Sequence, residues 1–398
     1  MRDIVVRTGS PGEKRGVELT VWRRQLLGLL TVGLTWGSTM AQGGFPHWTA
    51  TLSGPRSDMG ATAVGDQAFF AGGGGYDPVQ NKWRVRSEVD IYDATSDSWS
   101  RVELSLGRDH LAATTAGDIA LFAGGRTRRS SAAATSVVDM FDAGTGSWST
   151  ANLSEARFTL AATTVRSKAL FAGGIGATGS YSDRVDIYDA ETGGWSTAAL
   201  SQPRAWVCAT TVGGKAFFAG GRIGEYVCSD IVDIYDADTG EWSTATLSRP
   251  RGFMAAATVG NKAFFAGGSE RGTSGFSDVV DIYDADTGLW SAEALSLPRH
   301  WCSAVSLGHF LLVAGGLTSL THDVIDILDV ENGTWTVEHL SEERGRMGAV
   351  ALGDLAVFAG GELYGHTTDV VDIFAIPEPA TLSLLALGGL VLVRRRKR

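Results

Sequence analysis

One unit of 45 to 52 residues recurs seven times along this chain, and this repeat limits the possible folds more than any other feature of the sequence. Each copy contains an arginine and, sixteen residues later, the start of a Gly-Gly pair. The arginines are Arg56, Arg108, Arg157, Arg204, Arg251, Arg299 and Arg344, and the pairs begin at Gly72, Gly124, Gly173, Gly220, Gly267, Gly315 and Gly360. Apart from the spacing between Trp48 and Arg56, which is one residue shorter than in the other copies, only the stretch that follows Gly-Gly varies in length, so insertions are tolerated in a single connection.

Each copy divides into four short runs with β-strand composition. In the fourth copy these runs are 207–212, 215–219, 231–236 and 242–247, rich in Val, Ile, Phe, Tyr and Thr and separated by turn residues. Four strands in a repeat of this length are typical of one propeller blade. We therefore predict an all-β fold: a seven-bladed β-propeller with four antiparallel strands per blade.

The tryptophans add two expectations about this propeller. They are Trp48, Trp99, Trp148, Trp195, Trp242, Trp290 and Trp335. Because a tryptophan ring has a large apolar surface, we expect these rings to dominate the core between neighbouring blades. The seventh copy lacks its own tryptophan, whereas Trp48 precedes the first arginine with no third-strand run before it. The segment 48–52 is therefore predicted to be the outer strand of the seventh blade, which closes the ring and leaves no open edge.

The order of motifs resembles a known family. Gly-Gly after an apolar strand, then Tyr-Asp, then Thr-Gly-x-Trp, is similar to the Kelch repeat over roughly residues 45–376; the sixth and seventh copies depart by carrying Leu328 and Phe374 at the tyrosine position. The resemblance implies a Kelch-type propeller. It also brings in two enzyme types on the same scaffold, a copper oxidase acting on galactose and a sialic-acid mutarotase. No catalytic constellation for the mutarotase is recognised in the sequence, and a carbohydrate-active enzyme on this scaffold is the alternative function.

Both ends of the chain have the composition of sorting signals. Residues 1–41 contain Arg23-Arg24, an apolar run and Thr39-Met40-Ala41, which predicts a secretory signal peptide with a long leading segment. Whether the route is general secretion or twin-arginine export, and whether translation starts further downstream, is left open. The expected organisation is a signal at 1–41, a propeller at 42–376 and a sorting tail at 377–398.

The C-terminal tail resembles the PEP-CTERM sorting signal. Pro377, Glu378 and Pro379 precede an apolar run and a basic cluster that ends the sequence. This resemblance implies processing by an exosortase-type enzyme and a place in the cell envelope, on the outer surface or in the extracellular matrix. The tail is expected to hold the protein in the cytoplasmic membrane before processing, and an ordinary C-terminal membrane anchor is the alternative.

The charge of the chain excludes nucleic acid as a partner. The formal net charge is −10, and both terminal segments are basic, so the body between them is more acidic still. An acidic body repels phosphate backbones. The three cysteines, Cys208, Cys228 and Cys302, are too few for a disulfide framework, although a pair involving Cys228 remains an alternative to free thiols.

Two sets of residues are candidates for a ligand site. Every copy carries an aspartate in the Val-Asp-Ile-Tyr run, and these are Asp90, Asp139, Asp186, Asp233, Asp281, Asp326 and Asp372. Each arginine could pair with such an aspartate inside the fold, or the arginines could form a ring that contacts a ligand. Next to them, on the side of the variable connections, lie aromatic residues that are either core rings or a binding arc. The candidate binding residues are Phe158, Trp206, Phe253, Trp301, Arg157, Arg204, Arg251 and Arg299.

Metal sites are weakly indicated, and we predict no metal and no cofactor. The Asp-Ala-Asp-Thr-Gly sequences at 236–240 and 284–288 are similar to the start of a calcium loop, but a hairpin turn explains them better because the expected glutamate is missing. His300, His322 and His366 fall on connections of the last two blades and could share a face, although scattered surface histidines are the simpler interpretation. The sequence thus favours a non-catalytic module that binds a protein or a glycan.

Overall fold

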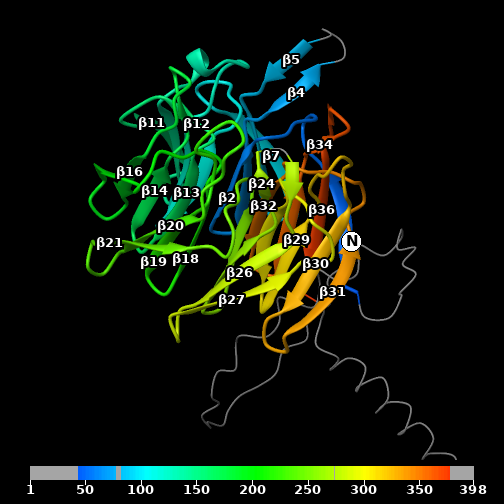
Figure 1. Ribbon diagram of the computed structural model, residues 1–398. Coiled ribbons are helices and arrows are strands. Elements are labelled where there is room, and N and C mark those ends of the chain that lie inside the picture. The colour runs from blue at the N-terminus through cyan, green and yellow to red at the C-terminus, as the bar shows by residue number, and fades with distance from the viewer. Residues whose placement is uncertain (1–43, 78–81, 273, 377–398) are drawn as a thin grey trace, which may run out of the picture. The chain divides into compact units, whose positions relative to one another are not determined.

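The computed structural model describes residues 44–77, 82–272 and 274–376 of the chain. The predicted signal at 1–41 and sorting tail at 377–398 lie outside these described residues. Seven four-stranded antiparallel sheets make up the described part, and each is one blade of a propeller (Figure 1). The first strand of each blade contacts the first strand of the next, and β32 contacts β2, so the blades form a closed ring. The predicted fold class is confirmed.

The blades follow one another along the chain, and in each the first strand is the innermost. Blade 1 consists of β2 (Gly60–Val64), β3 (Gln67–Ala71), β6 (Glu88–Asp93) and β7 (Ser98–Glu103). Blade 2 consists of β8 (Ala112–Ala116), β9 (Ile119–Ala123), β10 (Val137–Asp142) and β11 (Ser147–Asn152). Blade 3 consists of β13 (Ala161–Val165), β14 (Lys168–Ala172), β16 (Arg184–Asp189) and β17 (Gly194–Ala199). Blades 4 and 5 consist of β18 (Cys208–Val212), β19 (Lys215–Ala219), β20 (Ile231–Asp236) and β21 (Trp242–Thr246); and β22 (Ala255–Val259), β23 (Lys262–Ala266), β26 (Val279–Asp284) and β27 (Leu289–Ala294). Blades 6 and 7 consist of β28 (Ser303–Leu307), β29 (Phe310–Ala314), β30 (Val324–Asp329) and β31 (Thr334–His339); and β32 (Gly348–Leu352), β33 (Leu355–Ala359), β36 (Val370–Ala375) and β1 (His47–Thr51).

The two ends of the propeller differ in their connections. Short turns join the first strand to the second and the third to the fourth, and we call this end the turn face. The variable connections and the links between blades lie at the other end, the loop face, as the antiparallel order requires. The small elements of the loop face are β4 (Gly74–Asp77), β5 (Lys82–Val85), η1 (Ser131–Ala133), β12 (Arg157–Phe158), β15 (Ile175–Gly176), β24 (Ser269–Arg271), β25 (Ser274–Phe276), β34 (Glu362–Leu363) and β35 (His366–Thr367).

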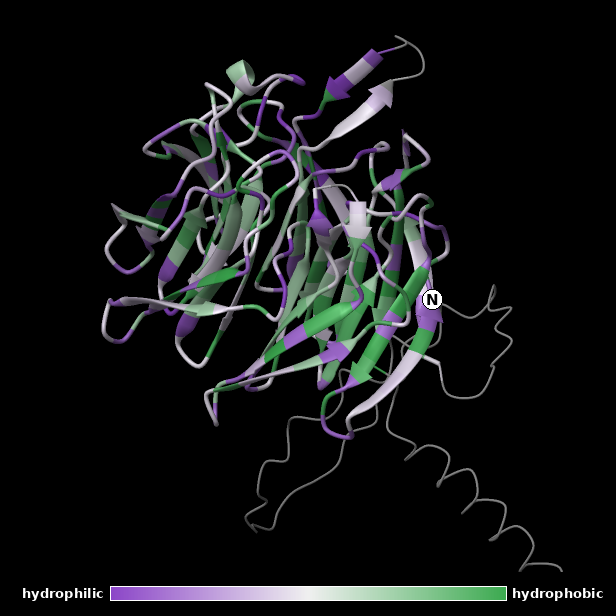
Figure 2. Cartoon of the chain, in the orientation of Figure 1, coloured by the Kyte–Doolittle hydropathy of each residue, from purple (hydrophilic) through white to green (hydrophobic). Residues whose placement is uncertain are grey.

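The core lies between neighbouring blades. Second strands such as β19 are buried along most of their length, whereas fourth strands such as β21 are largely exposed. One cluster joins Leu170 and Ile187 of blade 3 to Phe218 and Tyr235 of blade 4, and equivalent clusters join the other blades. Figure 2 shows this as hydrophobic residues concentrated in the strands and hydrophilic residues in the connections. Burial between sheets, rather than within one sheet, therefore holds the ring together.

The tryptophans contribute less to this core than the sequence suggested. Trp242 stands on the outer strand of blade 4, is only partly buried, and packs against Tyr235 and Phe218 with ring-centroid distances of 5.2 and 6.0 Å. The fully buried rings are instead phenylalanines of the second strands, such as Phe218 itself. An outer strand has no further strand beyond it, so its side chains lie at the rim of the core and cannot dominate it.

The N-terminal strand closes the ring as predicted, but with a different register. β1 pairs with β36, so the seventh blade is completed by residues from the start of the described chain. His47, not Trp48, pairs with Phe374 and occupies the position that tryptophan has in the other blades; the two rings stack at 4.2 Å. Trp48 points to the opposite side of the strand and is 37% exposed. A slip of one residue reverses the faces of a strand, and the spacing from Trp48 to Arg56, one residue shorter than in the other copies, is its signal.

Candidate ligand-binding site

The seven repeat arginines are structural. Each is buried, and each pairs with the aspartate of its own blade: Arg56 with Asp90, Arg108 with Asp139, Arg157 with Asp186, Arg204 with Asp233, Arg251 with Asp281, Arg299 with Asp326 and Arg344 with Asp372. Their guanidinium groups also donate to backbone carbonyls of the second strand. Arg157, Arg204, Arg251 and Arg299 are fully buried and paired within their own blades, so they have no surface to offer a ligand and do not belong to the candidate site.

The same aspartates also fasten each blade to the one before it. Asp233 accepts a hydrogen bond of 2.9 Å from the backbone N–H of Ser201, which follows the outer strand of blade 3. The equivalent bond forms in all seven blades, from Ser53, Ser105, Ser154, Ser201, Ser248, Ser296 and Ser341. Arg204 belongs to the same connection between blades 3 and 4, and its guanidinium donates to Asp233 and to the carbonyls of Gly220 and Ile231 in blade 4. This arrangement explains why the spacing from arginine to Gly-Gly is invariant.

On the loop face, seven residues surround the propeller axis, and each stands two positions after the repeat arginine of its blade. We call this set the axial ring, and its members are Asp58, His110, Thr159, Trp206, Phe253, Trp301 and Arg346. The backbone N–H of each donates to the carbonyl of the equivalent residue in the preceding blade, with N···O distances of 2.9 to 3.4 Å. The last of these bonds runs from Asp58 to Arg346, so the chain of hydrogen bonds is closed. The ring is a rigid platform to which all seven blades contribute.

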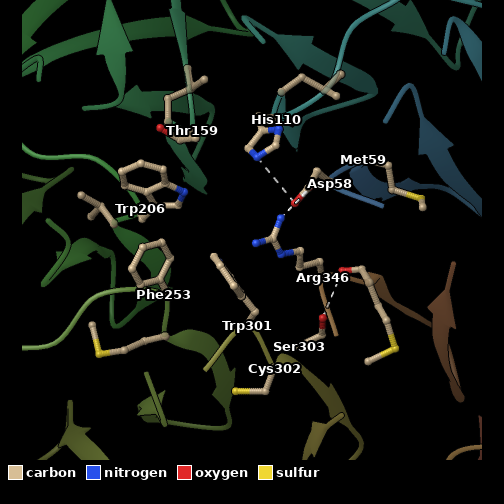
Figure 3. A pocket seen from close by; sticks show the side chains of 15 residues that line it. Asp58, Met59, His110, Thr159, Trp206, Phe253, Trp301, Cys302, Ser303 and Arg346 are labelled. Atoms are coloured by element: carbon tan, nitrogen blue, oxygen red, sulfur yellow. Dashed lines mark hydrogen bonds and ion pairs between the residues drawn. The ribbon is translucent and has the colours of Figure 1, made fainter. Parts of the chain in front are cut away.

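The backbone of the axial ring has an unusual conformation. All seven residues have a positive φ between 51° and 58°, which is rare for residues other than glycine and costly for a β-branched residue such as Thr159. The side chains converge on the axis in Figure 3. Strained backbone that the surrounding structure enforces is typical of functional sites. This repeated conformation is the strongest structural reason to place a site here.

Sequence reasoning identified part of this ring. Trp206, Phe253 and Trp301 were selected because they stand two residues after an arginine, and the structure brings them together. Phe158 stands one residue after its arginine; it is buried beside Ile175 and Ala205 and does not line the cavity. The other four members were missed. Counting the same two-residue offset from every arginine would have found Asp58, His110, Thr159 and Arg346.

A cavity of about 230 Å³ lies within the axial ring. Its walls are the seven ring residues and Ser303, together with the residue that follows each ring member (Figure 3). These second-tier residues are Met59, Leu111, Leu160, Val207, Met254, Cys302 and Met347. The cavity is therefore apolar on the side of the inner strands and chemically mixed at the ring itself.

One half of the ring is aromatic. The rings of Trp206 and Phe253 lie 5.1 Å apart, and those of Phe253 and Trp301 lie 5.0 Å apart at 74°. His300 packs against Trp301 with a centroid distance of 4.2 Å and holds the carbonyl of Leu317 through its Nδ1. Burial lowers the pKa of His300 to about 4, so this supporting ring is neutral at pH 7. The aromatic half is thus supported by the neutral ring of His300 and by Arg222, whose guanidinium carbon lies 5.0 Å from the centroid of Trp206 and 5.9 Å from that of Phe253.

The other half is ionic. Asp58 lies between two cations or potential cations: its Oδ2 is 3.5 Å from Nη1 of Arg346 and its Oδ1 is 3.7 Å from Nε2 of His110. Behind them Asp109, which is fully buried, contacts His110 and accepts a hydrogen bond of 2.8 Å from Arg126. Although burial raises the pKa of Asp109, its contacts with His110 and Arg126 outweigh this effect and hold the pKa below its ordinary value. Asp109 is therefore a carboxylate at neutral pH.

The two halves meet where Arg346 lies over Trp301. The guanidinium carbon is 3.5 Å from the centroid of the indole, a short cation–π contact. Nη1 of Arg346 is also 3.5 Å from Glu362. No side-chain hydrogen bond of Arg346 is found within the described residues, and its Nε is buried without a partner. Arg346 is therefore held by its neighbours while its hydrogen-bond donors are not saturated.

The described histidines and cysteines form neither a metal site nor a reactive thiol. Within residues 44–77, 82–272 and 274–376, no group of three or more His, Cys, Asp or Glu side chains is arranged to hold a metal ion. His322 hydrogen-bonds to the hydroxyl of Thr318, and His300 hydrogen-bonds to the carbonyl of Leu317. All three cysteines are free and buried, and burial raises the pKa of Cys208 to about 12. A thiol with so high a pKa is not a nucleophile at neutral pH.

Two protein families match this sequence. The KLHDC2/KLHL20/DRC7 Kelch-repeats domain matches residues 109–316 and 160–361, which together span more than half of the chain. The PEP-CTERM protein-sorting motif matches residues 375–398. No curated protein matches the chain. No helix in the described part of the chain has the length and apolar character needed to cross a bilayer.

Proposed function

Since this chain belongs to the Kelch-repeat family and ends in a PEP-CTERM sorting motif, we propose that it is an exported, non-catalytic binding module that holds its ligand in the axial ring. The sorting motif indicates export, sorting to the envelope and processing by an exosortase-type enzyme. We further propose that residues 1–41 are the export signal, that 42–376 are the mature body, and that the tail at 377–398 holds the protein in the membrane until it is processed.

The axial ring is the observation that carries the binding proposal. It combines a rigid backbone, aromatic side chains, an unsaturated guanidinium and a carboxylate around one cavity. Small-molecule and side-chain sites are concave, mostly apolar and fitted with a few placed polar groups. The ligand is the end or side group of an envelope protein or polysaccharide, which the ring would grip from the loop face.

The last described residues lie on the turn face, opposite to the axial ring. β36 runs from the loop face to the turn face, where Ala375 pairs with Leu355 and the N–H of Ile376 donates to the carbonyl of Asp354. The chain therefore enters the sorting motif from the end of the propeller opposite to the axial ring. A protein held by its tail would present the ring away from the membrane.

Substituting the ring tryptophans tests the binding site. We expect Trp206→Ala and Trp301→Ala each to weaken binding by about 1–3 kcal/mol, because buried aromatic anchors carry most of the energy of an interface. Thr239→Ala and Thr287→Ala change exposed residues of the turn face and should have no effect. Binding is measured with the purified exported protein against separated polysaccharide and protein fractions of the host envelope, alongside oxidase and epimerase assays.

Two results would contradict the proposal. If both tryptophan variants unfold, as judged by thermal melts, while ring variants that fold retain full binding, the aromatic rings are core residues only. If turnover of a sugar is detected and is lost in the ring variants, the protein is a carbohydrate-active enzyme, the alternative raised by the Kelch resemblance.

Replacing Pro377-Glu378-Pro379 with alanines tests the sorting tail. The variant is expected to accumulate as a full-length, membrane-retained form, because the processing enzyme no longer recognises its motif. Mass spectrometry of the C-terminus and fractionation of the envelope measure the outcome. A variant with the same mature C-terminus and the same location as the wild type would mean that the tail is an ordinary anchor.

A further inference from the structure

The chemistry of the axial ring restricts its ligand more narrowly than the proposed function does. The first restriction is electrostatic. Around the ionic half, Arg126 and Arg346 stand against the carboxylates of Asp58, Asp109 and Glu362. The local charge is therefore close to zero. Neither a polyanion nor a polycation is attracted to such a site.

The second restriction comes from hydrogen bonding. Asp58 can only accept and Arg346 can only donate, and the distance of 3.5 Å between them is longer than an ordinary hydrogen bond. The contact from Asp58 to His110 is longer still, at 3.7 Å. A ligand group beside Asp58 and Arg346 therefore meets an acceptor and a donor that do not hydrogen-bond fully to each other. A hydroxyl group both donates and accepts, whereas a carboxylate or an ammonium group satisfies only one of the two partners.

The third restriction is shape. Trp301 already carries Arg346 on its ring, so it positions the guanidinium and is less free to receive a ligand. Arg222 also lies over Trp206 and Phe253, but its guanidinium carbon is 5.0 and 5.9 Å from their ring centroids, farther than Arg346 is from Trp301. Trp206 and Phe253 therefore supply the more accessible aromatic surface of the cavity, and the second tier below is apolar. The cavity of about 230 Å³ is smaller than the roughly 300–1,000 Å³ typical of pockets for drug-sized ligands. The ligand is thus small, with an apolar face next to several hydroxyl groups.

From these restrictions we infer that the axial ring binds one neutral sugar unit at the end of a polysaccharide chain. The C–H face of the sugar packs on Trp206 and Phe253. Its hydroxyls donate to Asp58 and accept from Arg346, with His110 beside them. This inference rests on the proposed function, because it assigns the ligand of the same site, and it favours a neutral glycan over an acidic polysaccharide or a peptide.

Matched sugars and one isosteric variant test the inference with the purified exported protein. Glucose, galactose and N-acetylglucosamine are compared with glucuronate, galacturonate and glucosamine by saturation-transfer-difference NMR and isothermal titration. At least one neutral sugar should bind, and its uronate counterpart should bind about tenfold more weakly or not at all. Asp58→Asn removes the negative charge but keeps the shape. It should weaken the binding of the neutral sugar about tenfold and reduce the ratio of the affinity for the neutral sugar to that for the uronate. Asp354→Asn on the turn face should change neither quantity.

The outcomes separate this inference from the proposed function. If uronates or short peptides bind better than every neutral sugar, and Trp206→Ala abolishes that binding, the ring is a ligand site but its assigned chemistry is wrong. If Asp58→Asn melts like the wild type and binds the neutral sugar unchanged, the contact to Asp58 is refuted. If no sugar, peptide or envelope fraction shows binding that depends on the ring, both the inference and the proposed function fail.

Discussion

Replacing Arg204 with methionine is expected to lower the free energy of unfolding by about 3–5 kcal/mol, the cost of breaking a buried ion pair. The guanidinium is fully buried and donates to Asp233 and to the carbonyls of Gly220 and Ile231 at 2.8 and 2.6 Å. Methionine fills much of the volume but leaves the carboxylate of Asp233 buried with the N–H of Ser201 as its main remaining donor. Chemical denaturation of the purified protein measures the loss.

A partly exposed pair in the same blade provides the control. Lys215 pairs with Asp236 on the turn face, where its side chain is 36% exposed. Because solvent screens such a pair, Lys215→Met should cost less than about 1 kcal/mol. The double variant Arg204→Met with Asp233→Leu should be less destabilised than Arg204→Met alone, since no unpaired charge remains. Equal losses for Arg204→Met and Lys215→Met would show that the buried pair does not fasten the blades.

The repeat made the fold predictable because its spacings report physical contacts. The constant distance from arginine to Gly-Gly reflects the guanidinium of Arg204, which must reach the carbonyls of Phe218 and Gly220. The predicted strands of the fourth copy were accurate to one residue at each end, since β18 begins at Cys208 and β21 ends at Thr246. Strand order and ring closure followed from the same counting.

Other features depend on interactions that a single repeat does not contain. The positive φ of residues such as Trp206 depends on hydrogen bonds between blades, so the local sequence does not predict it. The ionic half of the ring was missed because Asp58, His110 and Arg346 lie far apart in the sequence and differ in type; only their shared offset relates them. His47 stands where the other blades have tryptophan, and there its ring stacks on Phe374 and its Nε2 contacts Asp372. The repeat pattern, which marks this position by tryptophan, could not show this substitution.

The contact between the seventh and first blades depends on the N-terminal strand β1 and the residues that follow it. β1 pairs along its whole length with β36, and Leu52 is buried in a cluster with Phe70 of blade 1 and Val371 of blade 7. The N–H of Ser53 also donates to Asp90. Deleting residues 42–54 removes all of these contacts and exposes the edge of β36, a surface prone to pairing with other chains. We expect the cooperative melting transition to be lost and the protein to aggregate, as measured by calorimetry and size-exclusion chromatography.

Single substitutions make this test quantitative. Leu52→Ala should cost about 2–5 kcal/mol, the usual range for removing a buried leucine side chain. Leu247 is the matched control, since it has the same position between blades 4 and 5 and both leucines are 4% exposed. If the ring is closed, the contact made by the N-terminal strand is equivalent to a contact between internal blades, and the two losses should agree within about 2 kcal/mol, the spread seen at comparable sites. If Leu52→Ala leaves the free energy of unfolding unchanged while Leu247→Ala lowers it, the ring is open between its first and last blades, and β1 does not contribute to the stability of the propeller.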